Sequence, residues 1–571
     1  MLAGAALGLV GGIVWGHLGT WAAATLGLLV LTFVALVVAH ARVLETKERA
    51  SATLRFHERG LSRLEHAWAR LPLTSERFRA AAHPFASDLD VFGRGSLMQL
   101  VDATETRLGE ERLATLLSLE EPGTWPDDVA ARQAAVRDLA CRPGFREALA
   151  TAGGVTGDDR PDPAALMTWA EGTDTIPPAL RLLGFLVPVA LLVVWMGGAA
   201  RGGAPRFGLV ATVVALMLGG WVGVRLTPML SAASAREQAF TRWRVMIGVI
   251  ERETFEAPLL TRLRDTLRVN GRNASDEIAA LERIVGFVDA RRNEVFRLLV
   301  GPLLMWDVHC AWVLLRWRHR TGAHVRGWLE ALGQVEALAS LGGFAFEHPA
   351  FAWPELIAEP GVVAQALGHP LVADARRVDN DVSLPAAGRA LVVTGSNMSG
   401  KSTLLRALGV NLILATAGGP VCARSARFGP ARIATSMRIE DSLEEGVSHF
   451  YAELRRLKRV IDLAQAPGRV PVLFLLDEIL HGTNSRERVL GACAVVRELV
   501  SRGALGVVST HDLGITALGH ELGSQVQNVH FEEQVEGDQM TFDYILRPGI
   551  VQSSNALRLM RAVGIDVAGV R

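Results

Sequence analysis

A glycine-rich loop that ends in a lysine and a serine is the stretch of this sequence with the clearest chemistry. The apolar run 391–393 is followed by a G-x-x-x-x-G-K-S pattern at residues 395–402, and a predicted helix, 403–414, follows the loop. Glycines let backbone N–H groups close around a phosphate, and the helix points the positive end of its dipole toward it. Lys401 would neutralise the β- and γ-phosphates, and the Ser402 hydroxyl would hold Mg²⁺.

The order of these elements distinguishes a phosphate site from a glycine-rich turn that matches by chance. A buried strand, the loop and an amphipathic helix follow one another as phosphate binding requires. We therefore predict a nucleoside triphosphate site. The predicted binding residues are Gly395, Ser396, Asn397, Met398, Ser399, Gly400, Lys401, Ser402 and Thr403.

A second group of candidate residues follows two further apolar strands. The strand 470–478 ends in Asp477 and Glu478. Asp477 would hold Mg²⁺ through water, and Glu478 would be the general base for the attacking water. A purely structural role for both acids is the alternative, although a buried strand normally ends in a turn residue. After the strand 505–510, His511 is predicted to sense the γ-phosphate, with helix capping as the alternative.

Composition bounds the remaining possibilities. The chain has 571 residues, enough for two or more domains, and a formal net charge of zero, so no overall basic field indicates a nucleic-acid ligand. Its four cysteines lie far apart in the sequence, which fits a reducing compartment and gives no zinc or disulfide pattern. Half of the residues are hydrophobic and the mean hydropathy is positive, which favours membrane segments.

A first membrane hairpin is predicted near the N-terminus. Residues 2–38 carry His17 as their only ionisable side chain, and their length suits two spans of about 17–20 residues. Trp15 and Trp21 flank the expected break, as interfacial aromatic residues do. A cleaved signal peptide is the alternative, but no basic segment precedes the apolar run. The basic residues from Arg42 onward place the end of this hairpin in the cytoplasm.

A second membrane hairpin is predicted from the uncharged runs 182–200 and 207–224 and the short connection 201–206. A buried helical hairpin in a soluble core is the alternative. Two hairpins would return the chain to the same side, so the sequence predicts a multi-pass inner-membrane protein with four spans and cytoplasmic soluble parts.

The predicted organisation alternates membrane and soluble parts. The boundaries are a first transmembrane hairpin over 1–40, a helical core over 41–180, a second hairpin over 181–227, a second part of the core over 228–360, and an α/β phosphate-loop domain over 361–571. The fold class is therefore multidomain α and α/β, with a mainly parallel sheet in the last domain. A final helix is expected within 549–564.

The assembled motifs resemble the MutS family of ABC-type ATPases. TGSNMSGKSTLLR, LLDEILHGTN and VVSTHD are similar to its Walker A, Walker B and switch-histidine motifs. The region 436–453 resembles its signature, whose G-x-S-x-F-x-x-E pattern is met by Gly446, Ser448, Phe450 and Glu453. Weaker similarity to the family's helical core begins near Asp102, continues at 132–136 and returns at 334–341.

This resemblance implies a homodimer in which each ATP lies between one subunit's Walker motifs and Ser448 of the other subunit. Its cofactors would be ATP and Mg²⁺, and the implied ligand of the helical part is DNA, in a role related to mismatch repair. No N-terminal stretch resembles the family's mismatch-reading domain, whose place a membrane hairpin takes. The aromatic residue that precedes Asn380 in the family is replaced by Arg376, Arg377 and Val378.

Two other classes of membrane ATPase remain as alternatives. A transporter-like protein would carry an LSGGQ-type signature, which is absent, and polar residues along its spans. A signalling protein would use ATP to set its dimer state without any DNA ligand. The leading prediction is a membrane-anchored, MutS-like ATPase that couples ATP hydrolysis to DNA binding.

Overall fold

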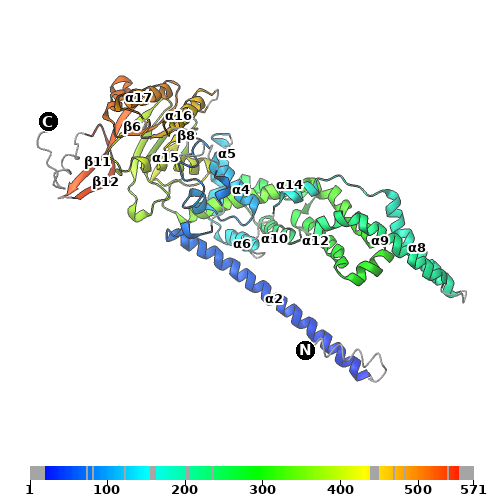
Figure 1. Cartoon of the computed structure of the whole chain (residues 1–571). Coiled ribbons are helices and arrows are strands. Elements are labelled where there is room, and N and C mark those ends of the chain that lie inside the picture. The colour runs from blue at the N-terminus through cyan, green and yellow to red at the C-terminus, as the bar shows by residue number, and fades with distance from the viewer. Residues whose placement is uncertain are drawn as a thin grey trace. The chain divides into compact units, whose positions relative to one another are not determined.

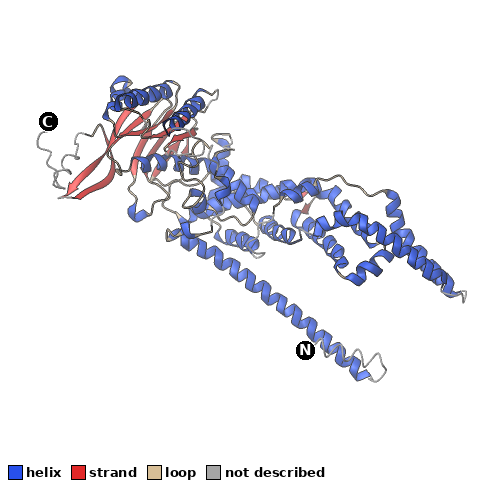
Figure 2. Cartoon of the chain, viewed as in Figure 1, coloured by secondary structure: helices blue, strands red, loops and turns tan. Residues whose placement is uncertain are grey.

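The computed structural model describes residues 20–72, 75–79, 83–120, 124–154, 162–200, 206–234, 237–269, 271–437, 449–466, 470–480, 483–536 and 539–551. The chain divides into two compact units. The helical unit comprises residues 1–58, 147–252 and 271–325, and the α/β unit comprises residues 59–146, 253–270 and 326–571. Figure 1 labels the elements, and Figure 2 shows that, apart from one short strand pair, the strands belong to the C-terminal part of the chain.

The helical unit contains the apolar helices. Its main helices are the first part of α2 (Thr20–Leu64), α8 (Pro178–Ala200), α9 (Arg206–Ser234), α10 (Glu237–Arg252), α12 (Ala274–Asp289) and the first part of α14 (Trp306–Glu347). Within α2, α8 and α9, three stretches are long and apolar enough to cross a membrane: Ala24–Leu64, Pro178–Ala200 and Arg206–Ser231. The predicted second hairpin thus coincides with α8 and α9, which pack against each other. The first predicted span lies almost entirely outside the described residues.

A bent apolar segment in the helical unit was not predicted. Phe296–Leu303 and α14 meet at an angle of 75° and together form a further candidate span or re-entrant loop. The segment packs against α9, where a Cβ on Gly219 would lie 2.2 Å from the carbonyl oxygen of Pro302. Only glycine allows this close approach. With the bent pair, the described residues hold up to four candidate spans, but the fourth lies after the second hairpin.

The α/β unit is organised around a six-stranded sheet. Its strand order is β12-β11-β6-β10-β9-β8, and all neighbours are parallel except the antiparallel pair β11-β12. The strands are β6 (Ala390–Thr394), β8 (Arg432–Ser436), β9 (Val472–Asp477), β10 (Leu505–Thr510), β11 (Val526–Glu536) and β12 (Gln539–Pro548). The mainly parallel sheet confirms the predicted fold class of this part.

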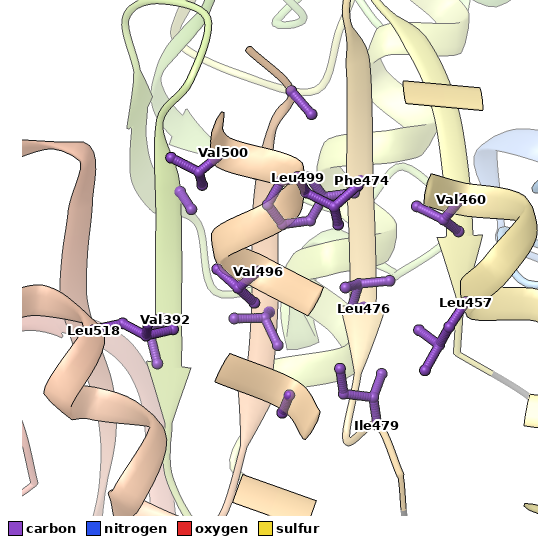
Figure 3. Packing of buried hydrophobic residues seen from close by; sticks show 14 of the residues in the cluster. Val392, Leu457, Val460, Phe474, Leu476, Ile479, Val496, Leu499, Val500 and Leu518 are labelled. Atoms are coloured by element: carbon purple, nitrogen blue, oxygen red, sulfur yellow. The ribbon is translucent and has the colours of Figure 1, made fainter. Parts of the chain in front are cut away.

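Helices cover both faces of this sheet because its central strands are apolar on both sides. On one face, α16 (His449–Gln465) and α17 (Ser485–Ser501) enclose a core that Figure 3 shows, in which Val392, Phe474 and Leu476 meet Val496 and Leu499. On the other face lies α15 (Lys401–Ala417). Gly409 of α15 packs so closely that a Cβ would lie 2.9 Å from Leu475.

The α/β unit also contains a second, four-stranded sheet. Its order is β3-β7-β4-β5, from β3 (Glu355–Leu356), β4 (Val362–Leu367), β5 (Asn380–Leu384) and β7 (Ser425–Phe428). The last predicted helix, 549–564, lies mostly outside the described residues, which end at residue 551.

Helices from the first part of the chain complete the α/β unit. These are α3 (Leu97–Val101), α4 (Arg107–Ser118) and α5 (Asp127–Ala140), with the second part of α14 beside them. Arg132 of α5 donates to the carbonyl oxygen of Thr416 at the end of α15, at 2.9 Å. Glu336 of α14 accepts from the backbone N–H groups of Glu105 and Thr106, at 2.8 and 3.1 Å. Residues that the sequence placed in the helical core therefore contact the α/β domain directly.

Candidate nucleotide-binding site

A pocket of about 930 Å³ opens where β6 and β9 end. Crevices beyond the carboxyl ends of parallel strands are where open α/β sheets bind ligands. Most of the residues predicted from the motifs line this pocket. They are Asn397, Met398, Gly400, Lys401, Ser402, Thr403, Asp477 and Glu478.

The glycine-rich loop joins β6 to α15 as the motif predicts. Gly400 caps the helix with a φ of 105°, a conformation that glycine adopts without strain. Lys401 is buried, and its Nζ donates to the carbonyl oxygens of Gly395 and Ser396, at 2.8 Å each. The same Nζ lies 3.2 Å from Oε1 of Glu478. A phosphate in the pocket would compete with these oxygens for the lysine N–H groups.

The two carboxylates at the end of β9 are held by the neighbouring strand β10. Ser509 donates its hydroxyl to Oδ1 of Asp477, and the backbone N–H of Glu478 donates to the carbonyl oxygen of Ser509 at 3.1 Å. His511 follows β10, and its Nδ1 lies 3.7 Å from Oε2 of Glu478. The side chains of Lys401, Glu478 and His511 therefore lie next to one another beside the pocket.

The loop residues suit a triphosphate with a magnesium ion. The hydroxyl oxygens of Ser396 and Ser399 are buried and have no hydrogen-bond partner among the described residues, so they could contact a phosphate. Ser402 and Asp477 present the oxygen ligands that Mg²⁺ prefers, and phosphates normally complete its coordination. Among the described residues, no group of three or more His, Cys, Asp or Glu side chains is placed to hold a metal ion.

An aromatic residue that sequence reasoning missed lines the same pocket. Tyr544 of β12 has a φ of 55°, and its ring would lie 3.2 Å from a Cβ on Gly400. Asn380 fixes this strand, because its side chain donates to the carbonyl oxygen of Tyr544 at 3.0 Å and accepts from the backbone N–H of Leu546 at 2.7 Å. Asn380 therefore holds the strand that places the Tyr544 ring beside the phosphate loop.

Part of the signature region lies outside the described residues. This applies to Gly446 and to Ser448, whose predicted role in the partner's site remains a prediction. Phe450 and Glu453 belong to α16, and Glu453 is buried and lines the pocket together with Ser436 and Met437 of the β8 end.

His369, which also lines the pocket, is buried and uncharged at neutral pH. Burial, and secondly the charge of Arg406, lower the pKa of His369 to about 4 from an ordinary value of 6.5. Its Nδ1 accepts from the backbone N–H of Leu371 at 3.2 Å. Between pH 6.5 and 4 the unfolded chain therefore binds a proton at this side chain that the folded chain does not.

This difference predicts an effect of His369 on acid stability. As the pH falls from 6.5 to 4, the free energy of unfolding should decrease. His369→Asn should reduce the slope of this decrease, because the variant lacks the one proton that the unfolded wild type binds at this position. Asn retains an acceptor for the N–H of Leu371 but does not titrate. Thermal unfolding of both proteins at pH 7.5 and pH 5 measures this; an equal loss of melting temperature in both would contradict it.

Comparison with known protein families matches the part of the chain that supplies most of the pocket's lining residues. Residues 391–568, from β6 to near the C-terminus, match the family model of MutS domain V.

Proposed function

This chain is a member of the MutS family and carries its ABC-type ATPase domain, and we propose that it hydrolyses ATP in a membrane-anchored homodimer. The observation that supports this most is the convergence of Lys401, Asp477 and Glu478 on one pocket at the carboxyl ends of β6 and β9. Phosphoryl transfer to water needs little beyond positioning and charge, and these residue types supply both.

We assign each residue a role from its position in or beside the pocket. Lys401 would turn from the loop carbonyls to the β- and γ-phosphates. Glu478 would accept a proton from the attacking water, with His511 beside it contacting the γ-phosphate. Mg²⁺, bound by Ser402 and Asp477, would neutralise phosphate charge. Tyr544 offers an aromatic face to the nucleotide base.

A dimer would complete the site. In this proposal, Ser448 reaches the nucleotide bound by the other subunit, so hydrolysis requires two chains. Such a shared site would couple ATP turnover to whatever the helical parts bind.

The exposed apolar surface of the helical unit supports membrane anchoring. Val189 and Val193 of α8 are 57% and 63% exposed, and Val210 of α9 is 63% exposed. A bilayer would cover these side chains. In a chain with Cys141→Ser and Cys493→Ser, which removes the two cysteines that are not buried, a maleimide that does not cross membranes should label Leu490→Cys in inverted vesicles but spare Val189→Cys. Equal labelling of both positions would contradict the anchoring.

DNA is the ligand that family membership favours, and a membrane ATPase without a DNA ligand is the alternative. ATP hydrolysis by the full chain in nanodiscs, measured alone and with duplex, mismatched or branched DNA, separates the two. We expect one form of DNA to raise the rate. Hydrolysis that no DNA changes would remove the DNA role but leave the ATPase intact.

A further inference from the structure

The turn after β9 has an unfavourable backbone conformation at two residues. Glu478 has a φ of 46° and Leu480 a φ of 66°, both in the left-handed region. Residues other than glycine adopt this region only at an energetic cost, because their Cβ comes close to the backbone. The turn must therefore be held by its surroundings, and whatever holds it also orients the carboxylate of Glu478.

One support of this turn comes from α16. The backbone N–H of Leu480 donates to Oε1 of Glu453, whose side chain is 1% exposed. The other carboxylate oxygen, Oε2, is buried and has no hydrogen-bond partner among the described residues, although Glu453 lines the nucleotide pocket. A buried carboxylate with an unsatisfied oxygen lowers the stability of the fold. This indicates that Glu453 has a function other than stabilising the fold.

Asp88 contacts α16 and the end of β8. This carboxylate is fully buried, and its Oδ2 accepts from the hydroxyl of Thr435 at 2.6 Å, the backbone N–H of Met437 at 3.1 Å and the guanidinium of Arg456 at 3.2 Å. Arg456 lies three residues after Glu453, on the neighbouring turn of the same helix. Asp88 therefore joins the end of β8 to α16, and both line the pocket.

Asp88 belongs to a buried segment, residues 85–92, that precedes the matched ATPase domain by some 300 residues. The same segment contacts the helix that follows the phosphate loop. Leu89 packs against Gly409 of α15, and Asp90 lies 3.3 Å from Arg406. The segment thus contacts the helices on both faces of the sheet.

We propose that Asp88 and Glu453 are positioning residues that hold the turn 478–480 and thereby orient Glu478. Asp88 fixes α16 and the end of β8, and Glu453 transmits this constraint to the backbone of Leu480. That replacing Asp88 or Glu453 lowers the rate of hydrolysis rests on the proposed function, in which Glu478 is the general base. That these replacements loosen the backbone of the turn does not depend on the proposed function.

Two readouts test this proposal on the full chain in nanodiscs. Glu453→Ala and Asp88→Ala should each lower kcat at least tenfold and leave the dissociation constant of ATP within about threefold. Glu453→Gln, which keeps an acceptor for the N–H of Leu480, should retain most of the rate. Hydrogen exchange at the amide of Leu480 should become faster in both Ala variants and stay slow in Glu453→Gln.

The double variant separates a shared role from two unrelated defects. If both residues act on the same turn, the double variant Asp88→Ala/Glu453→Ala should be as active as the less active of the two single variants. Multiplied losses, unchanged hydrogen exchange at Leu480, or equal effects of Glu453→Gln and Glu453→Ala would overturn the proposal. Should Asp88→Ala fail to fold, Asp88→Asn, which keeps an acceptor for the N–H of Met437, replaces it. If the wild type hydrolyses no ATP, the proposed function fails and the exchange measurement still decides the positioning.

Discussion

Replacing Glu478 with Gln is expected to lower ATP turnover by about 100- to 10,000-fold, which is the usual contribution of a general base. Gln has the same shape but cannot accept a proton from the attacking water. ATP binding should not weaken, because the substitution also removes a negative charge that lies 3.2 Å from Lys401 and competes with phosphate for this lysine. Single-turnover hydrolysis and equilibrium binding of ATP measure the two effects separately.

A Glu-to-Gln change elsewhere on the same domain is the matched control. Glu498 of α17 is partly exposed and pairs with Arg502, so Glu498→Gln should leave turnover unchanged. If Glu478→Gln hydrolyses ATP as fast as Glu498→Gln, another group activates the water.

Replacing Lys401 with Ala is expected to weaken ATP binding by about 100-fold or more. The lysine would give up at least two charge-assisted hydrogen bonds to phosphate, each worth about 1.5–3 kcal/mol. The side chain is buried between the loop and Glu478, where it faces the space that the phosphates would occupy. Titration with a fluorescent ATP analogue measures the affinity.

Lys458→Ala is the control for this loss of charge. Lys458 is exposed on α16 and pairs with Asp462 one turn away, so its removal should leave the affinity unchanged. Equal affinities of Lys401→Ala and the wild type would show that the nucleotide is not bound at this loop.

The local sequence motifs were enough to predict the strands, the loop and the helix that carry the phosphate loop and the two carboxylates. The strand, loop and helix around residues 390–417, and the strands that end at Asp477 and Thr510, lie where the sequence indicated. Each motif carries its own structural context, since a phosphate loop requires a strand before it and a helix after it. The apolar helices α8 and α9 also lie where the sequence indicated, because apolar length alone predicts them.

Features that depend on distant contacts were missed. Tyr544 carries no signal of its own, because only the pairing of β12 with β11 and the side chain of Asn380 bring it to the phosphate loop. The bent segment near Pro302 is too short and too interrupted to be recognised as a span. Asp88 is an ordinary acidic residue in sequence, and its importance appears only when Thr435, Met437 and Arg456 surround it.

The central claim is that two chains share each site of ATP hydrolysis, and mixing two inactive variants tests it most directly. Lys401→Ala removes the phosphate-loop lysine, and Ser448→Ala removes the group supplied by the partner, so each alone should be inactive. Random mixing in nanodiscs should make half of the dimers mixed, each with one intact site, and restore about a quarter of the wild-type rate. A mixture as inactive as its two components, or full activity of Ser448→Ala alone, would contradict the shared site.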